Sequence, residues 1–144
     1  MAGGELLNTA EEERLAGIIR AVEHKTTGEL RVHITKHVSR HGVMADAAAA
    51  FLKLGMDKTV ARNGVLLFIA AKDHELACIG DKGIHDIIGE DGWKKIIADL
   101  RDYFSKGDYY IGLHRAIEAI GEVLYTHFPG KGSPNELPDE ISKS

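Results

Sequence analysis

Residues 62–83 read RNGVLLFIAAKDHELACIGDKG, and this stretch decides the fold. The run 65–71 is apolar on both faces, which is typical of a strand in the centre of a sheet, and 75–79 predicts another strand. Only Lys72, Asp73 and His74 separate the two runs. Since so short a connection joins antiparallel neighbours, we expect a hairpin whose second strand ends beside the start of the first.

A third strand is predicted upstream, over residues 30–38, where apolar and polar side chains alternate. Between it and 65–71 lies an alanine-rich stretch, 43–55, which predicts a helix that ends at Gly55. A helical connection makes the two strands parallel, so both begin at the same end of the sheet.

Further helices are predicted from helical spacing of apolar residues and from capping signals. Thr9 and Glu12 form an expected capping box before a helix over 10–25, and Asp108 is expected to cap the last helix. The other two helices should cover residues 84–88 and 91–104. The element order α-β-α-β-β-α-α-α indicates an α/β fold, a single-domain α/β/α sandwich with a small mixed sheet. We expect one domain over 1–144, with its core at about 6–128 and an irregular C-terminal tail at 129–144.

Three polar residues flank the predicted strands and should meet at one end of the sheet, where the parallel strands begin: Glu29, Asn63 and Asp81. Two carboxylates and a side-chain amide are ligands that Ca²⁺ or Mg²⁺ prefers. The sequence therefore predicts a divalent-metal site at this end of the sheet, with Asp91 as a further ligand. Other interpretations stay open. Asn63 could simply form a turn with Gly64, Glu29 could be a solvated charge on an edge strand, and Asp81 could be the N-cap of a helix.

The histidines give no comparable zinc site. His33 and His37 share one face of a strand, but four residues of extended chain separate them by about 13 Å. That distance is too large for one ion.

Composition excludes several other classes. A formal charge of −4 leaves no basic stripe for nucleic acid. The single Cys78 has no partner for an internal disulfide. The sequence as given shows no signal peptide and no apolar run long enough to insert in a membrane, so we expect a soluble, cytoplasmic protein.

Five short motifs lie along the chain: Thr27-Gly28-Glu29, Arg62-Asn63-Gly64-Val65-Leu66-Leu67-Phe68, Gly80-Asp81-Lys82-Gly83-Ile84, Gly89-Glu90-Asp91-Gly92-Trp93 and Asn135-Glu136-Leu137-Pro138-Asp139-Glu140. In this order and spacing they resemble the motifs of the TPM domain family, also catalogued as a TPM phosphatase domain, which includes a thylakoid lumen protein. The similarity runs from about Leu6 to Ile141 and indicates the small stand-alone bacterial branch.

The resemblance implies an α/β/α sandwich, divalent-metal binding near the sheet edge and, for some relatives, acid phosphatase activity. Many relatives carry a secretion signal or a membrane anchor, and we expect neither in this chain.

Two functional hypotheses follow. In the favoured one, the bound metal orders the loops of a module that binds another protein, such as a membrane- or envelope-assembly partner. In the alternative, the chain is a low-activity metal-dependent acid phosphatase that hydrolyses phosphomonoesters. Lys82 and Gly83 would then hold the phosphate, and Asp81 or His85 would move the proton.

Overall fold

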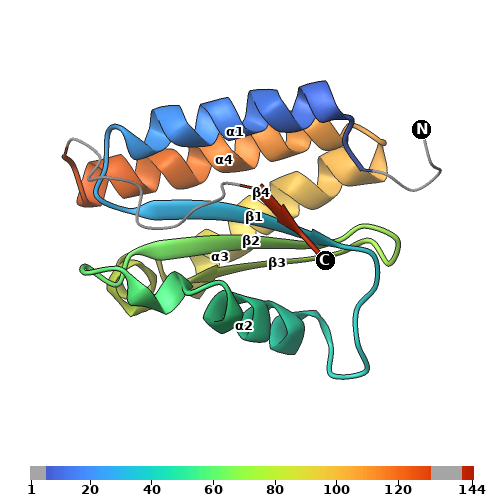
Figure 1. The fold of residues 1–144 in the computed structure, drawn as a ribbon, viewed down its shortest axis with the longest axis horizontal. Coiled ribbons are helices and arrows are strands. Elements are labelled where there is room, and N and C mark those ends of the chain that lie inside the picture. The colour runs from blue at the N-terminus through green and yellow to red at the C-terminus, as the bar shows by residue number, and fades with distance from the viewer. Residues whose placement is uncertain (1–5, 131–140) are drawn as a thin grey trace.

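The computed structural model describes residues 6–130 and 141–144. Its centre is a mixed sheet of four strands in the order β3-β2-β1-β4 (Figure 1). The strands are β1 (Glu29–Thr35), β2 (Gly64–Ala70), β3 (Glu75–Gly80) and β4 (Ile141–Lys143). β1 and β2 run parallel, and β2 and β3 form an antiparallel hairpin, which confirms both predicted pairings.

Helices cover both faces of the sheet, so the predicted α/β/α sandwich is confirmed (Figure 1). One face packs against α1 (Thr9–Glu23), α3 (Lys82–Ser105) and α4 (Tyr109–His127). The other packs against the shorter α2 (Val43–Lys53), which is followed by the 3-10 helix η1 (Met56–Lys58).

The alternation along β2 divides the core into two parts. Val65, Leu67 and Ile69 belong to the large apolar cluster beneath α1, α3 and α4. Leu66 and Phe68 face α2 and η1 instead. Because apolar side chains are needed on both faces, the run that sequence analysis placed at the centre of the sheet has no polar residue.

The helices differ from expectation in three places. Asp108 precedes α4 as predicted, but its side chain makes no capping hydrogen bond. The capping box is formed by Asn8 and Glu11, one residue before the predicted pair: the Asn8 carboxamide accepts from the Glu11 N–H at 2.8 Å, and the Glu11 carboxylate accepts from the Asn8 N–H at 3.0 Å. The two helices predicted after β3 form one segment, α3, kinked at Gly89, where φ is +70°. Glycine adopts this conformation without the steric cost that other residues meet.

The described end of the chain is a strand, where an irregular tail was predicted. Ile141–Lys143 pairs in parallel with β1. The ring of His33 bonds the hydroxyl groups of Ser142 and Ser144 at 2.8 and 2.9 Å. Strand β4 was not predicted because its three residues carry no recognisable periodicity, and long-range contacts form this strand.

Candidate functional site

The backbone positions at the predicted end of the sheet do meet. Glu29 is paired in register with Gly64, and the N–H of Asp81 donates to the Gly64 carbonyl at 2.8 Å. Glu29, Gly64 and Asp81 thus form a row across three neighbouring segments. We call Glu29, Arg62, Asn63 and Asp81 the rim.

Asp81 is held by internal partners. Its carboxylate accepts two hydrogen bonds from the Arg62 guanidinium, at 2.6 and 2.8 Å, and one from the Lys82 N–H, at 2.8 Å. It is therefore the N-cap of α3, as one of the open interpretations had it. Burial acts to raise the pKa of Asp81, but the bonds from Arg62 and Lys82 outweigh it, and the pKa lies below its usual value. Asp81 is ionised at neutral pH.

Asn63 and Glu29 are also buried, at 0% and 4% exposure. Asn63 Nδ2 donates to Thr27 Oγ1 at 3.2 Å, whereas Asn63 Oδ1 has no hydrogen-bond partner among the described residues. Glu29 is paired with Gly64, so its side chain lies on the same face of the sheet as position 64. Side chains alternate between the two faces along an extended chain, so the Asn63 side chain lies on the opposite face from that of Glu29.

Asp91 does not extend this group. It is exposed on α3, beyond the kink at Gly89 and away from the start of the helix at Lys82. Within residues 6–130 and 141–144, no three His, Cys, Asp or Glu side chains gather closely enough to hold a metal ion.

The residues predicted to handle phosphate have other contacts. The Lys82 N–H is bonded to Asp81, and the Gly83 N–H donates to the Arg62 carbonyl at 2.8 Å, so neither amide is open to an anion. His85 Nδ1 accepts from the indole N–H of Trp93 at 3.0 Å. Because an indole nitrogen only donates, this nitrogen of His85 carries a lone pair. Catalytic roles for Asp81 and His85 stay predictions.

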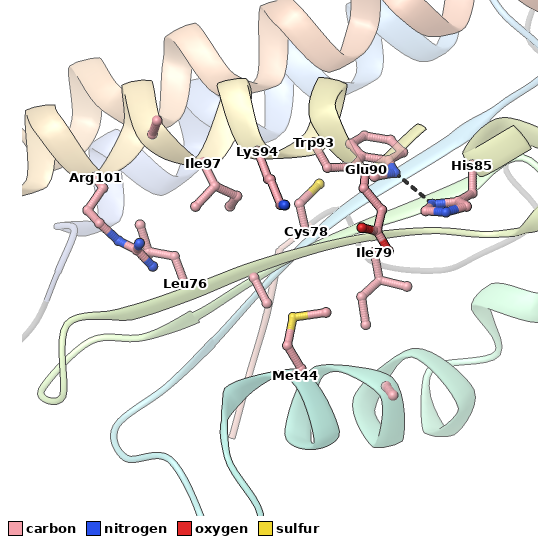
Figure 2. Close-up of a pocket in the computed structure, with 14 residues that line it drawn as sticks. Met44, Leu76, Cys78, Ile79, His85, Glu90, Trp93, Lys94, Ile97 and Arg101 are labelled. Carbon is pink, nitrogen blue, oxygen red and sulfur yellow. Dashed lines mark hydrogen bonds between the residues drawn. The ribbon is translucent and has the colours of Figure 1, made fainter. Parts of the chain in front are cut away.

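A groove of about 790 Å³ begins next to the rim and runs along β3, between α2 and α3 (Figure 2). Its floor is Leu76, Ala77, Cys78, Ile79 and Gly80, and its walls include Met44 and Ala48 from α2 and Trp93, Ile97 and Ala98 from α3. The lining is mostly apolar, with charged side chains only along α3.

The groove follows an open edge of the sheet. β3 is last in the strand order, so no strand in the described part of the chain pairs with its outer side. Along an antiparallel pair, every second residue directs its backbone N–H and C=O groups towards the neighbouring strand. The hydrogen bond from the Asp81 N–H to the Gly64 carbonyl therefore identifies the residues of β3 whose backbone groups point to β2. Ala77 and Ile79 bond to β2, whereas Leu76, Cys78 and Gly80 direct their N–H and C=O groups into the groove.

The thiol in the groove is not a nucleophile. Burial raises the pKa of Cys78 far above neutral, so the sulfur stays protonated. This agrees with the packing role that its place in an apolar strand indicates.

The groove was not predicted from the sequence, although part of its signal was present there. The hairpin and the central run made β3 an edge strand by elimination. The small exposed residues Ala48 and Ala98 leave the space of the groove open. The sequence does not show this, because it does not place α2 and α3 on either side of β3.

Comparison with known proteins gives a consistent result. The profile of the TPM domain matches residues 2–123. The NMR structure of the BA42 protein from the psychrophilic bacterium Bizionia argentinensis is 37% identical, with a TM-score of 0.87 and 97% of each chain covered. A search of curated proteins gives no significant match.

Two more distant structures share the fold alone. The N-terminal domain of a P. gingivalis protein is 21% identical with a TM-score of 0.74, covering 89% of this chain and 84% of that one. The N-terminal domain of the cg2496 protein from Corynebacterium glutamicum is 9% identical with a TM-score of 0.67, covering 95% and 86%. In the described residues, every helix is too short or too polar to span a bilayer.

Proposed function

We propose that this chain, which belongs to the TPM domain family, is a protein-interaction module that binds an extended segment of another protein along β3. The observation that carries the proposal is the open edge of β3 at the floor of an apolar groove. A strand added there would bond to the outward backbone groups of Leu76, Cys78 and Gly80. Its side chains would lie between α2 and α3, which is the arrangement of strand-addition complexes.

The groove has the shape that such an occupant requires. The groove lies along β3 with α3 on one side and α2 on the other, so a bound strand would have a helix facing each of its sides (Figure 2). Main-chain hydrogen bonds would supply affinity, and the apolar walls formed by Met44, Trp93 and Ile97 would supply hydrophobic burial.

In this proposal, the expected divalent ion would compete with Arg62 for the Asp81 carboxylate. As the side chains stand, the rim does not fit a metal, because the Arg62 guanidinium is the cation that Asp81 binds. The Arg62 side chain is 53% exposed and can move into solvent. The Met56 carbonyl oxygen lies close to Gly64, the residue paired with Glu29. A Ca²⁺ or Mg²⁺ ion that displaced Arg62 would take Asp81 as a ligand and fix the loop that precedes β2.

Phosphomonoester hydrolysis has less support from this geometry. Neither backbone amide at Lys82 or Gly83 is open to phosphate, and the Asp81 carboxylate is tied to Arg62. We expect no metal-dependent turnover of p-nitrophenyl phosphate above that of an Asp81→Asn variant.

The experiment is a selection of octapeptides from a random phage-displayed library, followed by titration of the selected peptide. Ala48 and Ala49 are adjacent and exposed on α2, but only Ala48 lines the groove. An Ala48→Trp variant should bind the peptide at least tenfold more weakly than wild type, while Ala49→Trp binds normally. Melting temperatures verify that both variants fold. Equal affinity of the two variants, or a library that yields no binder, would overturn the proposal.

A further inference from the structure

The groove is charged along one wall only. Three side chains of α3 extend over it: Glu90, Lys94 and Arg101 (Figure 2). Lys94 and Arg101 form no ion pair with any carboxylate of residues 6–130 or 141–144. The opposite wall, α2, contributes Met44 and Ala48 and no charged side chain.

The charges are also ordered along the groove. Arg101 lies beside Leu76, where β3 begins, and Glu90 lies near Ile79 and His85, towards the end of β3 (Figure 2). Lys94 lies between them. Two unpaired cations therefore face the first half of the strand edge, and the single carboxylate faces the other end.

We infer that the occupant of the groove is an extended segment with acidic side chains on the face that meets α3 and apolar side chains on the face that meets α2. This inference rests on the proposed function and names its partner class. Side chains of a strand alternate between faces, so acidic and apolar residues should alternate in the segment. The acidic positions lie over Leu76 and Cys78, within reach of Arg101 and Lys94, and not beside Glu90.

The two cations define specificity more than total affinity. Ion pairs at an exposed position contribute little each, but at the border of an apolar groove they suppress segments of the wrong charge. A lysine-bearing segment would place like charges next to Lys94 and Arg101.

Three synthetic octapeptides test the inference, each N-acetylated and C-amidated. They alternate valine with glutamate, glutamine or lysine, and NMR titration follows the amides of residues 76–80. The glutamate peptide should bind about tenfold more tightly than the glutamine peptide at low salt, and the lysine peptide should be weakest. Charge reversal in Lys94→Glu and Arg101→Glu should reverse this order. Lys95→Glu, on the same helix but outside the groove, should leave it unchanged.

The outcomes separate the inference from the function on which it rests. If all three peptides shift residues 76–80 with equal affinity, the charge preference is overturned while strand addition stands. If the order survives charge reversal at both positions, Lys94 and Arg101 do not set it, and the inference is again overturned. If no peptide shifts residues 76–80, the proposed function fails and the inference fails with it.

Discussion

Gly80 lines the groove, and Asp81, the next residue, belongs to the rim. The two regions differ in whether their polar groups have hydrogen-bond partners. At the rim, the Asp81 carboxylate is bound by Arg62 and by the start of α3. In the groove, backbone groups of β3 point towards an apolar channel, and no strand of the described residues lies beside them. The Asp81 side chain, which the sequence predicts as a metal ligand, is therefore already bound by other residues of the protein. The unpaired hydrogen-bonding groups of β3 belong to the backbone, which no sequence motif marks.

The largest effect is expected at Gly83, where the rim loop contacts α3. A Cβ there would collide with the carbonyl oxygen of Ala61 and lie 2.7 Å from that of Arg62. Because backbone atoms cannot move aside cheaply, Gly83→Ala should destabilise the protein by about 3 kcal/mol. We expect a melting temperature lower by roughly 10 °C.

Gly17 supplies the matched control. A Cβ there meets nothing closer than 3.9 Å, on a helix. Gly17→Ala should stabilise the protein by about 0.5–1 kcal/mol. If the two alanine variants melted alike, the backbone of Ala61 and Arg62 would not pack tightly against the start of α3.

The next effect concerns the charge of Asp81. Asp81→Asn keeps the capping oxygen but removes the ionic contact with Arg62, which should cost about 1–2 kcal/mol at pH 7. Since the pKa of Asp81 is lower in the folded state than in the unfolded state, its contribution is present above pH ~4 and disappears as the pH falls through the lowered pKa. Urea unfolding of both proteins from pH 7 to pH 3 measures it.

Asp102→Asn is the comparison for Asp81. That carboxylate pairs with Lys106 on the surface, with both side chains more than half exposed. Its loss should cost less than about 0.5 kcal/mol. A wild-type advantage over Asp81→Asn that persisted undiminished at pH 3 would show that the charge is not its source.

The smallest effect is on cation binding at the rim. Arg62 adopts a left-handed conformation, with φ of +52°, and binds Asp81. Arg62→Gln keeps the Cβ and so leaves this backbone cost unchanged, but it removes the competing charge. Calcium affinity, measured by calorimetry, should rise about three- to tenfold. Arg40→Gln removes a charge from the loop before α2 and should have no effect; an equal rise in both variants would point to long-range charge alone.

Much of the fold could be predicted because its signals are local. The length of the connection 72–74 specifies the hairpin, and the uninterrupted apolar run 65–71 specifies the central strand. With the parallel strand predicted at 30–38, these also predicted that Glu29 and Asp81 lie at the same end of the sheet, on either side of β2.

The remaining features depend on contacts that a linear pattern does not contain. Nothing in the order of residues shows that Arg62 binds Asp81, because the pair forms only after β2 and β3 have aligned. Strand β4 is similarly formed by contact with β1 and His33. The groove exists because no fifth strand of the described residues lies beside β3 and because the side chains there on both helices include small ones.

Amide hydrogen exchange along β3, with and without the selected octapeptide, tests the central claim most directly. The account predicts that the peptide slows exchange at Leu76, Cys78 and Gly80 at least tenfold more than at Ala77 and Ile79, which already bond to β2. Equal slowing at all five amides, or protection confined to the rim, would contradict strand addition at this edge.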